Sequence, residues 1–266
     1  MAQLKRIVFG DDGSAAADVA WLWLNSHSWP GWVVTVVHAE LPDLTRLPID
    51  AGLTSLHEWQ PRRPRQNFAE ACFAEVRHLT ALADPRIVLW SCQDAGLVVV
   101  GPHGPGLLKA VHLGSTAEWL LVRPPAPLLI VKSARPVRSV LACMDGSPSA
   151  WRAVRALAAL PWLSTVSVTV LGAEDGRAEV LAAVPAAAAE LRVVAGEVQE
   201  RIAGGPATNA IHDVLDRMDV DLVVLGTRGH TGLKHLLLGS TASHVARAAQ
   251  CSVLVAADCP RPSGSE

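Results

Sequence analysis

Two segments of the sequence combine glycines with hydroxyl residues at a spacing that can hold an anion. The second of them follows a short β-branched run at residues 221–225, and small apolar residues recur at helical spacing after Ser240. We therefore expect a strand, a glycine loop and a helix with Ser240 as its N-cap. The backbone amides of a helix start have no partner within the helix and favour a phosphate group. The residues expected at this site are Gly226, Gly229, Gly239, Ser240 and Thr241.

The first glycine segment repeats this spacing after an apolar run at residues 97–100. Repetition of the whole pattern indicates two similar structural units. Pro102 and Pro105 remove two backbone N–H groups from the first segment, so we expect it to be the weaker site. The second segment has Thr227 and His230 at those positions. The residues expected at the first site are Gly101, Gly104, Gly114, Ser115 and Thr116.

The starts of the two halves also match each other. Residues 7–14 and 140–147 each read as an apolar strand that ends in Asp-Gly-Ser, and the next strands align at 35–40 and 169–174. With these landmarks, the pattern Gly-x2-Gly-x9-Gly-Ser resembles the nucleotide-binding motif of universal stress proteins, here as a tandem pair over nearly the whole chain. The resemblance implies five strands in each half and two halves packed as a pseudo-symmetric pair.

The same resemblance implies roles for individual residues. Asp145 would accept hydrogen bonds from ribose hydroxyls or the adenine amine, and the backbone of Ala173 would contact the adenine edge. Arg228 and His230 are weaker candidates for contacts to phosphate. Alternatively, Asp145 only caps the following helix, and the glycines only satisfy loop geometry. The matching candidates in the first half are Asp12 and Ala39.

Composition limits the classes of partner. Half of the 266 residues are hydrophobic, and 23 basic residues face 25 acidic ones, so neither nucleic acid nor an anionic membrane is an expected partner. The N-terminus lacks a signal-peptide pattern and no apolar run reaches the roughly 18 residues of a membrane span, so we expect a cytoplasmic protein. The five cysteines are expected to be reduced thiols, and the histidines to hold no metal.

The first half departs from the expected order of strands and helices. A helix is predicted at 15–25 with Val19, Leu22 and Trp23 on its inner face, and a Pro-rich loop, or flap over the site, at 41–66. Helical spacing returns at 67–82, and a third strand is predicted at 86–90. Only 91–96 would then precede the strand at 97, whereas a parallel crossover needs a dozen or more residues. Either residues 86–90 do not form the standard third strand, or that strand is placed unusually in the sheet, and this departure could deform the first pocket.

The alternation of strands and helices predicts an α/β fold of two tandem, doubly wound parallel sheets. This class is Rossmann-like and similar to the adenine nucleotide alpha hydrolases. The predicted domains are residues 1–134, with the shortened crossover, and residues 138–257, followed by a disordered tail at 258–266. The apolar run at 127–131 could pair across the pseudo-twofold axis, within one chain as a pseudo-dimer or between two chains as a homodimer.

The resemblance implies binding of ATP, ADP or AMP, with Mg²⁺ as the accompanying ion. It also implies a role as a stress-response sensor or regulator that an unidentified protein partner reads. Residues 229–234 have glycines and a lysine at the wrong spacing for a P-loop, and no constellation of nucleophile and base stands out. Binding is therefore favoured over catalysis. A slow ATPase and a nucleotide-free interaction module of the same fold remain alternatives.

Overall fold

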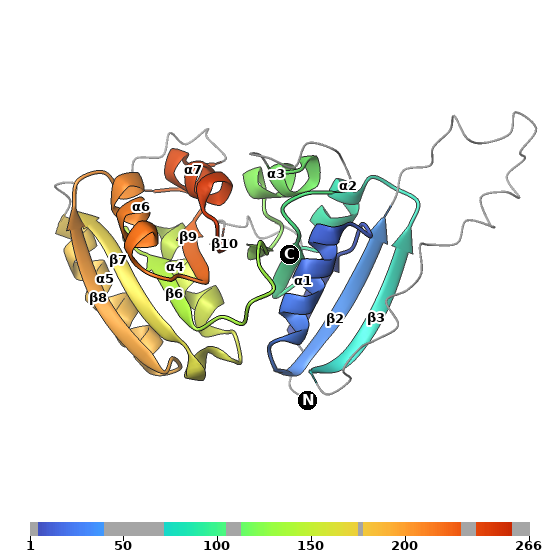
Figure 1. The fold of residues 1–266 in the computed structure, drawn as a ribbon, viewed down its shortest axis with the longest axis horizontal. Helices are drawn as coiled ribbons and strands as arrows, with labels where there is room; N and C mark the ends of the chain where they lie inside the picture. Colours follow the sequence, from blue (N-terminus) through green and yellow to red (C-terminus); the bar gives the residue numbers. More distant parts are fainter. Residues whose placement is uncertain (1–4, 40–71, 105–112, 175–177, 230–237, 257–266) are drawn as a thin grey trace, which may run out of the picture.

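The computed structural model describes residues 5–39, 72–104, 113–174, 178–229 and 238–256. These residues form one ten-stranded sheet with the strand order β3-β2-β1-β4-β5-β10-β9-β6-β7-β8. The first half of the chain occupies one side of the molecule and the second half the other (Figure 1). The strand order of the first half therefore recurs, mirrored, in the second.

The elements of the first half share the order strand, helix, strand that the sequence predicts for a doubly wound sheet. They are β1 Lys5–Gly10, α1 Ala15–Asn25, β2 Trp29–Ala39, β3 Phe73–Ala81, α2 Pro85–Trp90, β4 Leu97–Val100, α3 Ser115–Val122 and β5 Leu128–Ile130.

The second half has its strands in the same order, but its helix α5 has no counterpart among the described residues of the first half, and α6 is longer than α2. They are β6 Ser139–Cys143, α4 Pro148–Ala158, the short 3-10 helix Leu163–Thr165, β7 Ser167–Glu174, α5 Ala178–Arg192, β8 Glu197–Gly204, α6 Ala207–Arg217, β9 Leu222–Gly226, α7 Ser240–Ala248 and β10 Ser252–Ala256.

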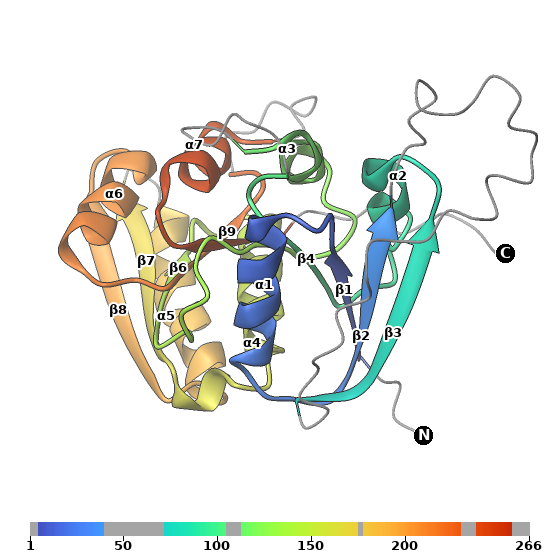
Figure 2. The ribbon, with the colours of Figure 1, turned by 45° about the vertical axis from the view of Figure 1, so that its right-hand side comes forward.

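Helices cover both faces of the sheet and divide its core into two layers (Figure 2). The buried residues of α1, α4 and α5 pack on one face, and those of α2, α3, α6 and α7 pack on the other. Neighbouring residues of one strand, such as Val8 and Phe9, therefore belong to different layers. This explains why the central strands read as continuous apolar runs.

The two halves meet at an antiparallel strand pair, whereas all the other strand pairs of the described sheet are parallel. In that pair, Leu129 of β5 lies opposite Leu254 of β10, and both side chains are buried. The expectation that the apolar run at 127–131 can pair across the pseudo-twofold axis is confirmed within one chain.

The helix predicted at 67–82 is wrong within the described residues, and of the two alternatives for 86–90 the first is confirmed, because these residues do not form the third strand. Phe73–Ala81 is β3, a strand paired with β2, and Pro85–Trp90 is α2. Asp84 caps this helix by accepting the N–H of Arg86 at 2.9 Å, and Pro85 suits its first turn. The crossover from β3 to β4 therefore spans residues 82–96 and contains a helix. Its only shortened part is α2, with 6 residues against 11 in α6.

The helix predicted at 15–25 is confirmed as α1, but its inner face is only partly as predicted. Trp23 is buried and Val19 packs against the core, whereas Leu22 is 58% exposed. Trp21 and Leu24, which lie outside the predicted stripe, are buried as well. The predicted loop at 41–66 and the predicted tail at 258–266 lie outside the described residues.

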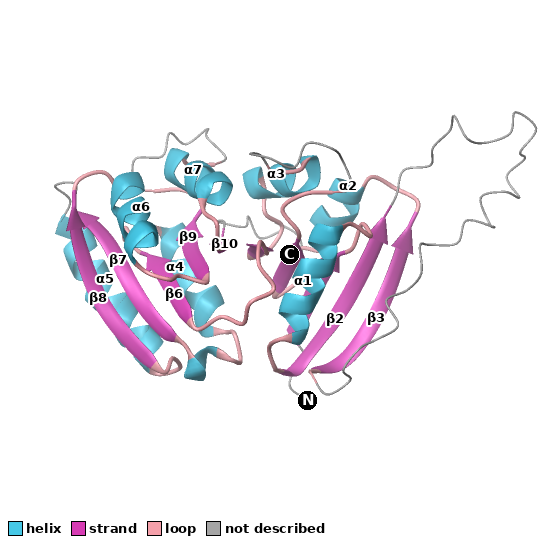
Figure 3. Cartoon of the chain, in the orientation of Figure 1, coloured by secondary structure: helices cyan, strands magenta, loops and turns pink. Residues whose placement is uncertain are grey.

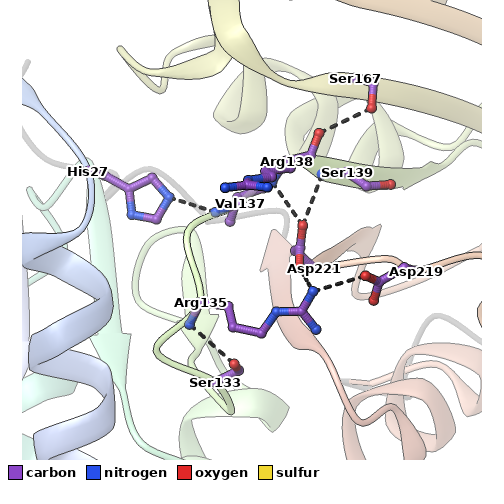
Figure 4. Close-up of polar contacts among 9 residues, drawn as sticks. All are labelled: His27, Ser133, Arg135, Val137, Arg138, Ser139, Ser167, Asp219 and Asp221. Atoms are coloured by element: carbon purple, nitrogen blue, oxygen red, sulfur yellow. Dashed lines mark hydrogen bonds and ion pairs between the residues drawn. The ribbon is translucent and has the colours of Figure 1, made fainter.

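The segment that links β5 to β6 is held by residues of both halves (Figure 4). Asp221, just before β9, accepts the N–H groups of Arg138 and Ser139 at 2.9 and 3.1 Å. Arg135 donates to Asp219 at 2.9 Å. The start of β6 is thus fixed to the start of its neighbour β9.

His27 joins the end of α1 to this linker. Its Nε2 accepts the N–H of Val137 at 3.1 Å (Figure 4). Its Nδ1 donates to the Trp23 carbonyl at 2.8 Å. The ring packs against Trp162 of the second half, with centroids 4.5 Å apart. Burial lowers the pKa of the imidazole from 6.5, although the Trp23 carbonyl and the charge of Asp221 act in the other direction. The folded protein therefore favours neutral His27.

We expect His27→Gln to remove part of the acid sensitivity of folding. The unfolded chain binds a proton at a higher pH than folded His27, so wild-type stability falls as pH decreases through 6.5 towards the lowered folded pKa. The slope due to one group approaches about 1.4 kcal/mol per pH unit. Urea denaturation between pH 7.5 and 5 measures it in both proteins. The exposed His78→Gln serves as the control, and an unchanged slope in His27→Gln would contradict this role.

Candidate functional site

Each half has one cavity at the carboxyl ends of its strands, with volumes of 290 Å³ in the second half and 350 Å³ in the first. In Figure 3, α3 and α7 lie at the edge to which the arrowheads of β2, β3 and β8 point. In a doubly wound sheet this is the edge where ligands bind. The volumes lie at the small end of the roughly 300–1,000 Å³ typical of ligand pockets.

Every described residue that the sequence suggests for the second site lines one cavity. The lining also includes apolar residues from β6, β7, β9 and α6 that the sequence did not single out. His230 lies outside the described residues. The candidates brought together are Asp145, Ala173, Gly226, Arg228, Gly229, Gly239, Ser240 and Thr241.

Asp145 follows β6 and starts the turn into α4. Its Oδ1 accepts the N–H of Ser147 at 2.9 Å, and Gly146 between them takes a φ of +84°, which favours glycine. The N-cap of α4 is Ser147, whose hydroxyl accepts the N–H of Ala150 at 3.2 Å. The helix therefore does not depend on Asp145 as its cap. The second oxygen of Asp145, Oδ2, lies on the side of Gly229.

The three glycines of the second segment are needed for space rather than for backbone conformation, because none of them has a positive φ. A Cβ on Gly226 would lie 2.5 Å from the nitrogen of Ala150 and 2.6 Å from the carbonyl carbon of Ser149. The close approach that requires Gly226 is thus that of α4. A Cβ on Gly229 would lie 2.9 Å from Asp145 Oδ2, at the cavity itself.

The start of α7 leaves backbone donors at the cavity. Its N-cap is Gly239, not Ser240 as the sequence suggested, and no side chain caps it. Gly239 itself donates to the Thr227 carbonyl at 2.7 Å. Among the described residues, the amides of Ser240, Thr241 and Ala242 have no hydrogen-bond partner. These donors and the helix dipole favour an anion at this end of the cavity.

Two serines at the start of α4 hold the glycine loop, and only the sequence Ser-Pro-Ser at 147–149 could have indicated them. Ser147 donates to the Arg228 carbonyl at 3.0 Å, and the Arg228 N–H donates to the Ser149 hydroxyl at 3.2 Å. Arg228 Nε and Thr227 Oγ1 are buried and lack a hydrogen-bond partner among the described atoms. The loop is thus fixed, with two polar groups unsatisfied beside the cavity.

The opposite wall of the cavity is apolar. It is formed by Leu171, Leu225 and Ile211 together with Cys143. Burial, with smaller effects from Asp145 and Cys251, raises the pKa of the Cys143 thiol to about 12. The thiol is therefore neutral near pH 7 and serves as apolar surface, not as a nucleophile. A flat aromatic base fits such a wall.

The first cavity is built in the same way, so the expectation that it is deformed is wrong. Asp12 Oδ1 accepts the N–H of Ser14 at 2.9 Å, and a Cβ on Gly104 would lie 3.0 Å from Asp12 Oδ2. Pro85 and Leu89 of α2 supply the wall that a shortened crossover would lack. The predicted residues that line it are Asp12, Ala39, Gly101, Gly104, Gly114, Ser115 and Thr116.

Histidines and carboxylates do not gather into a metal site in the described part of the chain. Within it, no group of three or more His, Cys, Asp or Glu side chains could hold a metal ion. His244 packs edge-on against His212, with ring centroids 5.0 Å apart. None of the helices in the described ranges is both long and apolar enough to cross a bilayer.

Comparison with known proteins finds similarity to one family. Residues 136–257 match the family model described as the universal stress protein family. A universal stress protein of Mycolicibacterium smegmatis is 28% identical over 94% of this chain and 96% of its own length. One of Mycobacterium tuberculosis H37Rv is 29% identical over 94% of this chain and 96% of its own length.

Solved structures share the fold over the whole chain. A universal stress protein of Archaeoglobus fulgidus has a TM-score of 0.65 at 18% identity, covering 96% of this chain and 99% of that one. A functionally unknown protein of Pseudomonas aeruginosa PAO1 has a TM-score of 0.66 at 21% identity, covering 96% of this chain and 93% of that one. At this identity the likeness concerns the fold.

Proposed function

This chain belongs to the universal stress protein family, and on that basis we propose that its second half binds ATP or a related adenine nucleotide. The observation that carries the proposal is the set of unpartnered amides at the start of α7, which face the same cavity as Asp145 among the described residues. A nucleotide needs such a pair of features, one acceptor for its ribose and one anion site for its phosphates.

The lining supports one orientation of the ligand. The apolar wall of Leu171 and Ile211 would contact the base, and Asp145 Oδ2 would accept from the ribose hydroxyls. The phosphates would then reach the amides of Ser240 and Thr241. Arg228 would satisfy its buried Nε at the same place. Mg²⁺, if required, would be held mainly by phosphate oxygens and water.

The proposed role is regulation through binding. The described lining of the second cavity contains one carboxylate, Asp145, which is already engaged with the Ser147 N–H. The proposed orientation assigns its Oδ2 to the ribose and leaves no other carboxylate in that described lining to act as a base, so we favour a regulator over an ATPase. We further propose that residues 1–134 and 138–257 are its two domains, and that a protein partner distinguishes the bound from the free state.

The test is calorimetric titration of nucleotide-stripped protein with ATP and Mg²⁺, in the wild type and in Ser240→Asp. The new carboxylate occupies the first position of α7, where a negative charge stabilises the helix but repels phosphate. We expect the affinity for ATP to fall at least about tenfold, which corresponds to about 1.4 kcal/mol, while the unfolding midpoint stays the same or rises. Ser115→Asp, at the matching exposed position of α3, is the control.

The outcomes separate binding from folding. Loss of ATP binding in Ser240→Asp, with binding retained in Ser115→Asp, supports the proposed site. Equal affinities in the wild type and in Ser240→Asp would remove it. No heat at millimolar ATP in any of the three proteins would remove the nucleotide proposal altogether.

A further inference from the structure

We propose that the first cavity binds an unphosphorylated nucleoside rather than a nucleoside polyphosphate, so that the two halves take different ligands. The inference rests on the proposed function, because it takes the second cavity as the nucleotide site. Matching positions in the two cavities agree at the base and ribose end. At the phosphate end they differ in the glycine loop, in the residues that hold the loop and in the charge of the first helical turn.

The base and ribose end is complete in the first cavity. Asp12 makes the same turn as Asp145, with Oδ1 on the N–H two residues later. Val37, Leu89 and Val100 form an apolar wall on the first cavity. The cavity volume, 350 Å³, is no smaller than the 290 Å³ of the second. A base and its sugar therefore find the same types of contact here.

The glycine loop of the first cavity offers fewer groups to phosphate. Pro102 stands where the second loop has Thr227, so the first loop lacks that hydroxyl. His103 replaces Arg228 and with it the guanidinium whose Nε is unsatisfied among the described atoms. A guanidinium is the side chain best suited to bidentate contact with phosphate. That bidentate contact is thereby lost at this end of the first cavity.

The first loop is also held less firmly. Ala16 of α1 occupies the position of Ser149 in α4, and the backbone of Ala16 packs against Gly101 as the start of α4 packs against Gly226. One hydroxyl contact remains, from Ser14 to the His103 carbonyl at 3.3 Å. The serine that orients the loop N–H in the second half is replaced by this alanine. Loops that bind phosphate with backbone groups depend on such fixed orientation.

The two helix starts share a glycine N-cap without a side-chain cap, Gly114 in α3 and Gly239 in α7, and differ in the charge of the first turn. The first turn of α3 contains Glu118, and the matching position in α7 is Ser243. Glu118 forms an ion pair with Arg247 of α7, which makes the pair neutral overall. It therefore adds no attraction for an anion, and its carboxylate partly offsets the positive charge at the N-terminal end of the α3 dipole. The first turn of α7, all of it described, contains no acidic residue.

The experiment uses the full chain with the second cavity silenced by Ser240→Asp and Asp145→Asn. Adenosine and ATP with Mg²⁺ are titrated separately by calorimetry, after thermal melting has shown that the protein is folded. We expect adenosine to bind near one equivalent and at least tenfold more tightly than ATP. Adding Asp12→Asn, which keeps an oxygen for the Ser14 N–H, should abolish the adenosine heat.

A second variant tests the cause of the preference. Pro102→Thr with Glu118→Ser, added to the silenced protein, copies the second half at two positions, and we expect ATP affinity to rise at least tenfold with adenosine affinity unchanged. ATP binding as tight as adenosine in the silenced protein would overturn the inference. The absence of adenosine binding in the silenced protein would also overturn the inference. If wild type still binds ATP and Ser240→Asp does not, only this inference fails; if no protein binds either ligand, the proposed function fails too.

Discussion

Gly226→Ala is expected to lower the free energy of unfolding by about 2–3 kcal/mol and to abolish nucleotide binding in the second half. The added Cβ would lie 2.4 Å from Ser149 Oγ and 2.5 Å from the nitrogen of Ala150. Contact with backbone atoms in the first turn of α4 cannot be relieved by a side-chain rotation. Either β9 or the start of α4 must shift, and the shift breaks the contacts that hold Arg228.

The matched control is Gly204→Ala at the end of β8. No described atom lies within 4 Å of a Cβ there and its φ is not positive, so the change should alter stability by less than about 1 kcal/mol. Urea denaturation gives the stabilities, and titration with ATP and Mg²⁺ gives the affinities. Equal unfolding midpoints for the two variants would show that the close approach of α4 to Gly226 does not determine the stability.

The sequence could predict the parts of the fold that repeat or that depend on local chemistry. The two Asp-Gly-Ser turns, the glycine spacing and the starts of α3 and α7 lie where the pattern places them. The pattern could not distinguish Gly239 from Ser240 as the N-cap, because both residue types occur there. That difference matters, since a serine cap would occupy an amide that we propose binds phosphate.

The wrong or missed predictions concern an edge strand, a short helix and a contact between residues far apart in the sequence. β3 lies at the edge of the sheet with most side chains exposed, so its apolar residues are too few for a strand signal. α2 has only 6 residues, and its apolar composition reads as a strand. Ser149 acts on Arg228, which is distant in sequence, so the local sequence Ser-Pro-Ser could indicate the serine but not its partner.

The glycine loop and the α4 start therefore form one unit in the second half. Gly226 lets the helix approach β9, Ser147 and Ser149 then reach the Arg228 backbone, and the loop is fixed beside Asp145. In the first half the close approach is kept, at Gly101 against Ala16. Ala16 at the start of α1 thus lacks the hydroxyl with which Ser149, at the start of α4, holds the glycine loop of the second half.

Leu129→Asp is expected to destabilise both halves at once, by more than about 4 kcal/mol. Leu129 is 1% exposed and faces Leu254 across the antiparallel pair, so the new carboxylate would be buried without a partner. Leu22→Asp is the control, because Leu22 is 58% exposed and its replacement should cost less than about 1 kcal/mol. Urea denaturation followed by tryptophan fluorescence and by ATP binding reports on both halves.

The effect should extend to the nucleotide site because residues of the first half hold α7. Lys132, just after β5, donates to the carbonyls of Ala246 and Ala249 at the end of α7, and Arg247 of α7 pairs with Glu118 of α3. Displacing β5 therefore releases both contacts on the helix whose start we propose holds the phosphates. We expect the two probes to give coincident transitions in wild type and in Leu129→Asp. Separate transitions, with ATP binding retained after the first, would show that the halves fold independently despite their shared sheet.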